Sequence, residues 1–183
     1  KKNWDKFEIR IIDQKNYSDI SKEYMSLHVK DSGKIHRPIE TFQAQLELIN
    51  QGEGFVVQVI DKTIGVFVGM LIVLYNKNSA YDWSVAVDPD YKNEYVSHLM
   101  KWKTIQHLQE IGIKYYELGL ASIVPSYLIQ PNDKKYGISH FKDGWARGKL
   151  KKVFLAEKYY DGNALEQVWQ KKLLEIKRYL QVK

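Results

Sequence analysis

Hydrophobic and polar residues alternate along the chain with two different periods, and these periods predict its strands and helices. Residues 7–12, FEIRII, read as a β-strand. Apolar residues then recur three or four positions apart over 17–27 and again over 39–51, which is typical of one face of a helix. Pro38 suits the start of the second helix. The N-terminal part is therefore expected to form a strand followed by two helices.

Three β-rich runs joined by short polar turns come next. They cover residues 54–60, 63–75 and 79–88. Short polar connections between such runs are typical of antiparallel neighbours, so the sequence predicts an antiparallel meander.

Beyond the meander, helices and single strands are expected to alternate. A long helix is predicted over about 93–111, with Gly112 as its C-terminal stop, and a strand over 113–119 follows it. A loop and a short helix then lead to a further strand at 150–157. One face of a final helix is formed by Leu165, Trp169, Leu173, Ile176 and Leu180.

This order of elements predicts a mixed α/β fold with a single central sheet, as one domain over 1–183. The strand–helix–strand piece from Ser79 to Gly119 should be the parallel part of the sheet, because a crossover helix joins parallel neighbours. No apolar run approaches the roughly 18 to 20 residues that a membrane-spanning helix needs, so no membrane span is expected.

The composition of the chain excludes several kinds of functional site. The chain has no cysteine, which excludes disulfides, thiolate zinc sites and cysteine nucleophiles, and we expect a cytoplasmic protein. The net charge of +6 attracts phosphates, although it is equally compatible with a solvated lysine-rich surface. The sequence contains no P-loop, no dinucleotide fingerprint, no Gly-x-Ser-x-Gly elbow and no metal-ligand spacing, so no metal is expected.

The predicted order of elements is similar to that of the GNAT superfamily of acyl-CoA N-acyltransferases, in which two parallel strands splay apart around the acyl donor. Within it, residues 80–119 resemble the Fem-type branch, the aminoacyltransferases that build peptidoglycan cross-bridges. The resemblance lies in an aromatic-rich strand, in the segment from Leu99 to Trp102, and in a strand that ends YELG. The run ISHFKDGW, 138–145, resembles the branch's Phe-Lys signature, and residues 24–42 resemble an upstream segment of its short relatives.

Two features depart from that pattern. Superfamily members usually carry a glycine-rich loop before the helix after the fourth strand, and its backbone N–H groups hold the pyrophosphate of coenzyme A. The corresponding stretch here, DPDYKNEYVSH, has no glycine. Fem-type enzymes usually contain two such domains, and this chain has room for one. The acyl donor is therefore expected to be either an acyl-CoA or an aminoacyl-tRNA.

Lys142 is the predicted catalytic cation. It lies beside Phe141 and three residues before Trp145, in a segment that its glycines make a poor candidate for a long helix. Aromatic shielding would strengthen the field of its ammonium on a developing oxyanion. The resemblance implies the same role, because the Fem-type Phe-Lys pair lines the acyl-transfer centre. The alternative is a surface lysine lying over apolar neighbours.

Glu117 is the second predicted catalytic residue. It ends a strand, where open sheets tend to hold their sites, and it could accept or orient the proton of an amine. The alternative is a strand-end carboxylate paired with a lysine. The fold further implies that backbone N–H groups around Val85 and Val87 hold the donor's carbonyl group.

Further substrate contacts are expected outside these two strands. His36 and Arg37 lie in a loop with Lys34, and an arginine there suits a carboxylate or phosphate of the acceptor. Tyr81 could flank the groove. Lys134 and Lys135 could meet a substrate phosphate. Each of these residues could equally be part of an ordinary solvated surface.

The expected function is transfer of an acyl or aminoacyl group to an amino group. The acceptor would be a small amine, an amino sugar or a cell-wall precursor, free or nucleotide-linked, and tRNA and a second copy of the chain are further candidate partners. The first alternative is a binding or regulatory module that keeps the fold without the chemistry. The second is an RNA-binding protein that relies on its basic charge, whose affinity would fall steeply with salt.

Overall fold

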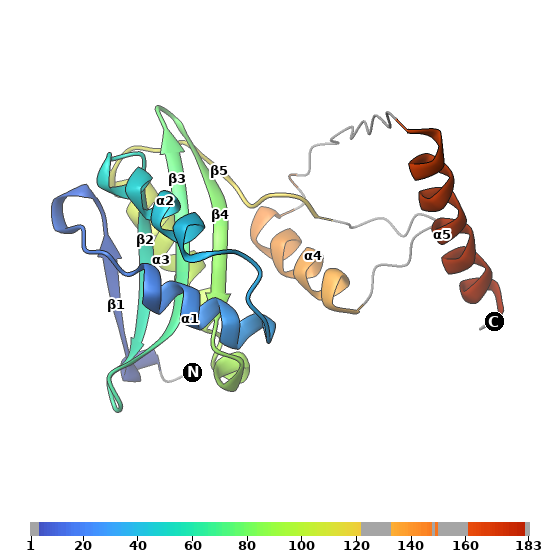
Figure 1. Cartoon of the computed structure of the whole chain (residues 1–183). Helices are drawn as coiled ribbons and strands as arrows, with labels where there is room; N and C mark the ends of the chain where they lie inside the picture. Colours follow the sequence, from blue (N-terminus) through green and yellow to red (C-terminus); the bar gives the residue numbers. More distant parts are fainter. Residues whose placement is uncertain (1–3, 122–132, 148, 150–160, 182–183) are drawn as a thin grey trace. The chain divides into compact units, whose positions relative to one another are not determined.

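The computed structural model describes residues 4–121, 133–147, 149 and 161–181 (Figure 1). The chain divides into two compact units, residues 1–119 and 120–183, and each has its own helices. The first unit contains the whole of the described sheet. The expectation of a single domain stays a prediction.

The first unit is built on a five-stranded sheet in the order β1-β2-β3-β4-β5 (Figure 1). The first four strands pair antiparallel, and β5 pairs parallel to β4. This confirms both the meander and the parallel strand–helix–strand piece. The strands are β1 (Phe7–Ile12), β2 (Gly54–Asp61), β3 (Val66–Asn76), β4 (Ser79–Val87) and β5 (Tyr115–Glu117).

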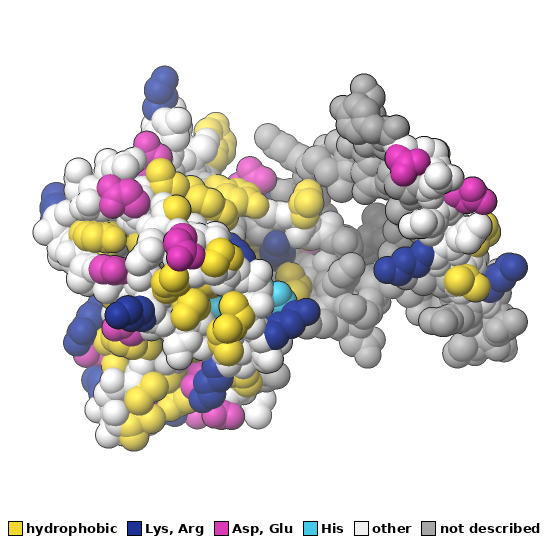
Figure 2. Space-filling view, viewed as in Figure 1, with side chains coloured by type: hydrophobic (Ala, Val, Ile, Leu, Met, Phe, Trp, Pro, Cys, Tyr) yellow, Lys and Arg dark blue, Asp and Glu magenta, His cyan; other side chains and the backbone are white. Residues whose placement is uncertain are grey.

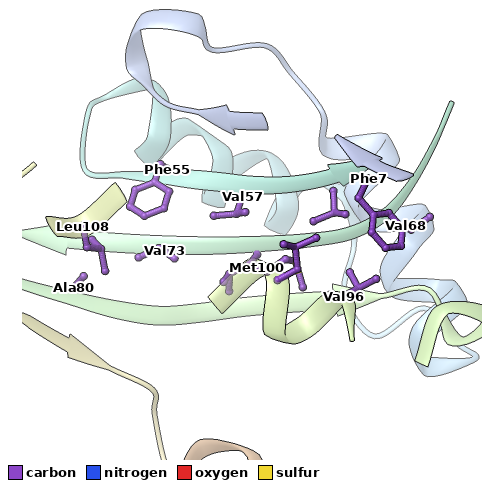
Figure 3. Packing of buried hydrophobic residues seen from close by; sticks show 12 residues of the cluster. Phe7, Phe55, Val57, Val68, Val73, Ala80, Val96, Met100 and Leu108 are labelled. Carbon is purple, nitrogen blue, oxygen red and sulfur yellow. The ribbon is translucent and has the colours of Figure 1, made fainter. Parts of the chain in front are cut away.

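Helices cover both faces of this sheet. On one face lie α1 (Ser21–Ser32) and α2 (Ile39–Asn50), and on the other lies α3 (Val96–Glu110) (Figure 1). Alternate residues of β2 and β3 point to opposite faces and enter two separate apolar clusters, one under each helical layer. Figure 3 shows the α3-side cluster, in which Phe55, Val57 and Val73 face Met100 and Leu108. Burial on both faces explains why these strands are apolar throughout.

The ends of α3 depart from the expected range of 93–111. Residues Pro89–Glu94 form a 3₁₀ turn, and the α-helix begins only at Val96. At the other end Gly112, at φ 80°, lets the backbone N–H of Ile113 donate to the carbonyl of Leu108 at 2.8 Å. This closing turn confirms the glycine stop. Ile113 belongs to this closing turn, so the strand that was predicted from residue 113 begins only at Tyr115.

Gly69 allows α3 to approach the sheet closely. A Cβ atom at this position would lie 2.6 Å from Val96 Cγ1 and 3.2 Å from Met100 Sδ. Gly69→Ala is therefore expected to lower the free energy of unfolding by about 1–3 kcal/mol, as overpacking of a core does. Urea denaturation measures this change.

Gly137→Ala is the matched control for that substitution. A Cβ atom at Gly137 meets nothing within 4 Å, and the residue is helical, so its replacement should leave stability unchanged or raise it. A Gly69→Ala protein as stable as the parent would contradict the packing of α3 on β3.

The second unit contains α4 (Asp133–Ala146) and α5 (Gly162–Gln181). The expectation that 138–148 is too glycine-rich for a long helix is wrong, because α4 runs for 14 residues through Gly137 and Gly144. Phe141 and Trp145 pack edge-on one helical turn apart, with ring centroids 6.4 Å from each other, and such pairs support a helix. The strand expected at 150–157 lies outside the described residues.

Candidate active site

The sheet opens between its two parallel strands. Pairing of β4 with β5 is limited to Ser79–Tyr115, Ala80–Tyr116 and Tyr81–Glu117. From Asp82 to Val87, β4 continues without a described pairing partner on that edge. The two strands therefore fork after the Tyr81–Glu117 pair, and we call the exposed edge of β4 the β4 opening.

Backbone N–H groups of β4 point into this opening. The N–H of Asp88 donates to the carbonyl of Val68 at 2.9 Å, which places it on the β3 side of the strand. Because successive residues of a strand turn their N–H groups to opposite edges, those of Val87 and Val85 face away from β3. This geometry agrees with the role expected for these two residues, which stays a prediction.

A β-bulge at Trp83 changes which side chains of β4 face each helical layer. Ser84 pairs with Ile72 and Asp82 with Val73, so Trp83 is the extra residue. Before the bulge, Ala80 joins the cluster under α3, and beyond it Ala86 joins the cluster under α1 and α2. Ala80, Ser84 and Ala86 are buried, whereas the aromatic side chains of the strand are exposed: Tyr81 at 42% and Trp83 at 37%. Both aromatic side chains are thus exposed among the described residues, and the groove contact expected for Tyr81 stays a prediction.

A buried ion pair lies at the fork. The side chain of Lys101, from α3, is 5% exposed and contacts the carboxylate of Asp82. Its Nζ also donates to the Tyr116 hydroxyl oxygen at 3.1 Å. Desolvation by burial, and then the negative charge of Asp82, raise the pKa of Tyr116 well above its usual range. These three residues join β4, β5 and α3 where the two strands part.

The loop between α1 and α2 forms a small cavity of about 60 Å³. Lys34, His36 and Arg37 line it together with His28 and Phe42. The Arg37 guanidinium lies over the ring of Phe42, 5.7 Å from its centroid. A cavity of this size has room for one small group, and its cationic lining suits an anionic one. His36 and Arg37 therefore lie together, as their predicted role requires.

Lys142 lies in α4, in the second unit. Its Nζ donates to the carbonyl oxygen of Leu120 at 2.8 Å, and both residues belong to that unit. Its placement beside the β4 opening stays a prediction. Lys134 and Lys135 lie in the first turn of α4, and their side chains are outside the described part. Glu117 is exposed and lies at the end of β5, as predicted, where β4 and β5 part. Its catalytic role stays a prediction.

Residues 27–133, more than half of the 183 in the chain, match a family model described as an acetyltransferase (GNAT) domain. The chain belongs to this family of GNAT acetyltransferase domains. It is therefore an acyltransferase of the GNAT type, and its predicted fold and enzyme class are confirmed. Membership of the Fem-type branch stays a prediction. No curated protein matches the chain.

Solved structures share the fold of this GNAT domain at low sequence identity. An aminoglycoside acetyltransferase from an uncultured soil metagenomic sample, in complex with sisomicin, is 15% identical, with a TM-score of 0.60 over 86% of this chain and 97% of that one. Glucosamine-6-phosphate N-acetyltransferase from Arabidopsis thaliana is 14% identical, with a TM-score of 0.53 over 85% and 99%. An aminoglycoside N-acetyltransferase in complex with coenzyme A is 13% identical, with a TM-score of 0.54 over 85% and 95%. At these identities the likeness shows the fold alone.

GNAT acetyltransferases use an acyl-CoA, and two parts of this domain fit such a donor unequally. The β4 opening offers N–H groups to a carbonyl, as described above. At the start of α3, Tyr95 adopts a left-handed conformation with φ 61°, which normally favours glycine. Asp88 and Asp90, at the start of the 3₁₀ turn that precedes Tyr95, pair with Lys30 at 2.6 Å and 2.9 Å. The β4 opening thus offers N–H groups that could donate to an acyl carbonyl, whereas the turn before α3 lacks the glycines expected around a pyrophosphate.

Two features of this GNAT domain were missed by sequence reasoning. One is the buried Lys101, whose signal was a lysine that shares a helical face with the buried Thr104 and Leu108. The other is the contact of His28 with Ser84 across the α1 face of the sheet. Among the residues the structure describes, no helix is long and apolar enough to cross a membrane, and no group of three His, Cys, Asp or Glu side chains could hold a metal.

Proposed function

We propose that this GNAT domain transfers an acyl group to the amino group of a small or glycan-precursor acceptor. The observation that carries this proposal is the fork of β4 and β5, with the N–H groups of Val85 and Val87 turned into the opening. Two such donors would hold the carbonyl oxygen of an acyl donor and stabilise the oxyanion that forms on it. A noncatalytic binding module would not need them.

Acyl-CoA is the donor that family membership supports. It supplies a thioester, whose carbonyl carbon the amine attacks. An aminoacyl-tRNA is the second candidate, because the turn at Tyr95 lacks the glycines that usually hold the pyrophosphate of coenzyme A. On the face shown in Figure 2, Lys and Arg side chains are interspersed with Asp and Glu side chains and form no broad basic surface. Binding of RNA through charge alone gains no support from this face.

We assign the remaining steps, oxyanion stabilisation and binding of the acceptor, to the predicted side chains. Lys142 would stabilise the developing oxyanion, and Glu117, exposed at the fork, would orient the amine. His36 and Arg37 would hold an acidic group of the acceptor in the α1–α2 cavity, such as a phosphate or carboxylate. The acceptor that this arrangement fits is therefore an amine that also carries a negative charge.

A thermal-shift screen followed by a turnover assay tests this function. Acetyl-CoA or aminoacyl-tRNA, added separately, should raise Tm by mass action, and the active donor should acylate at least one amine in a panel. The panel contains glucosamine 6-phosphate, glucosamine and an aminoglycoside. We expect glucosamine 6-phosphate to react faster than glucosamine, because only the former carries a phosphate. Binding of neither donor, or binding without turnover on any amine, would contradict the proposal and favour a binding module.

A further inference from the structure

His28 connects the α1–α2 cavity to β4. It lies on α1 and is half-buried, and its Nε2 is 3.2 Å from the Oγ of Ser84. Its ring packs edge-on against Tyr24, with centroids 4.7 Å apart, and at a tilt against Phe42, with centroids 5.3 Å apart. One hydrogen bond and two aromatic contacts therefore fix the imidazole in position.

This position lies between the two places where the substrates are proposed to bind. Ser84 belongs to the part of β4 that has no described pairing with β5, and it directly precedes Val85. On its other side, His28 lines the cavity that also contains His36 and Arg37. Its Nδ1 has no hydrogen-bond partner within the described ranges of the chain. An acceptor anchored by Arg37 would thus have its amino group between this imidazole and the β4 opening.

We propose that His28 removes a proton from the acceptor's ammonium group, with Ser84 holding the ring, and this inference rests on the proposed function. The ammonium gives one proton to the imidazole, and the free amine attacks the carbonyl carbon of the acyl donor. A C–N bond forms, and the bond from that carbon to the leaving sulfur or oxygen breaks. The second proton of the nitrogen passes to the leaving group, and the imidazolium releases its proton to solvent. Atoms and charges balance without any further reactant.

The charges around His28 keep the ring ready for this role. Burial is the largest effect that lowers its pKa, and the positive charges of Arg37 and His36 lower it further, whereas Asp31 opposes them. Lys34 also faces the cavity. A histidine with a lowered pKa is neutral at pH 7 and able to accept a proton. Glu117 is at the end of β5, whereas His28 lies on α1, so the two residues come from different elements.

Kinetics of His28→Gln test this assignment. With acetyl-CoA and the panel amine that reacts fastest, kcat/KM should fall by about 10²-fold or more, as for loss of a general base. The wild-type rate should level off above the pKa of His28. The rate of the variant should keep rising with pH, because it depends on amine already free in solution. Unchanged kcat/KM with an unchanged pH profile would overturn the proposal.

His107→Gln is the matched control. His107 lies on α3, on the opposite face of the sheet, and packs edge-on against Phe55 with centroids 4.6 Å apart, much as His28 packs against Tyr24. His107→Gln should lower Tm about as much as His28→Gln does, and it should leave kcat/KM and the pH profile unchanged. Ser84→Ala is the second variant, in case His28→Gln does not fold, and a partial loss of kcat/KM is expected from it.

A histidine NMR titration of the wild-type protein needs no turnover. His28 should titrate below the usual range of a histidine, because burial lowers its pKa, and Ser84→Ala should change its Nε2 shift. A His28 that is protonated at pH 7 would overturn the proposal even in an active enzyme. If the wild-type protein acylates no amine at all, the proposed function is wrong. If the enzyme is active and His28→Gln does not change its kinetics, only the role of His28 is wrong.

Discussion

Lys142→Met is expected to lower kcat/KM for acyl transfer by about 10²–10³-fold, the usual cost of removing one oxyanion-stabilising group. Methionine keeps the length and most of the apolar stem of lysine, so contacts with neighbouring apolar groups are largely retained. One hydrogen bond that is lost, from Nζ to the Leu120 carbonyl, lies in an exposed region. Tm should therefore change little, and the loss should appear in the rate.

Two further variants make this result specific to the charge at position 142. Lys142→Arg keeps a cation and should retain part of the activity. Lys171→Met removes an exposed lysine from α5 in the same unit and should change nothing. If Lys142→Met turned over at the wild-type rate with every active donor, the predicted role of the Phe-Lys pair would be wrong.

Asp82→Asn is expected to have the largest effect on stability. Lys101 would keep its charge in a buried site without its carboxylate partner, and breaking a buried pair in this way costs about 3–5 kcal/mol. Much of the 5–15 kcal/mol stability of a typical domain would be lost. Denaturant unfolding followed by circular dichroism measures the change.

Replacing both partners separates this ion-pair effect from simple loss of packing. Asp82→Leu combined with Lys101→Met leaves no buried charge and should be more stable than Asp82→Asn alone. Tyr116→Phe removes only the hydroxyl that accepts from Lys101 and should cost about 1 kcal/mol. If the double variant were destabilised by the sum of its single variants, the two charges would not be coupled across the fork.

The sheet could be predicted from sequence because its strands carry a strong apolar signal. Strand β2 is buried along its whole length, and the three-strand meander has short polar turns. The helix between β4 and β5 then required a parallel pair. The positions of Glu117 and of the loop with His36 and Arg37 follow from this topology, since strand ends and connecting loops gather at the edges of a sheet.

The side-chain arrangement at the fork could not be predicted from the sequence. A strict alternation along β4 would place Ala80 and Ala86 on one face, but the bulge at Trp83 sends them to opposite faces. The contact of Ser84 with His28 depends on that one extra residue. Lys101 reads as a surface lysine until the packing of α3 brings it against Asp82. Such contacts are set by tertiary packing, and no local pattern encodes them.

The proposed acyl transfer depends most on the backbone of β4 holding the acyl donor. Amide hydrogen exchange, followed residue by residue by NMR, tests this with acetyl-CoA and, separately, with an aminoacyl-adenosine. The amides of Val85 and Val87 should exchange at least about tenfold more slowly with one of these donors, as new hydrogen bonds form. The amide of Ala86 faces β3 and should be unaffected. A donor that raises Tm yet leaves Val85 and Val87 exchanging as in the free protein would contradict the account.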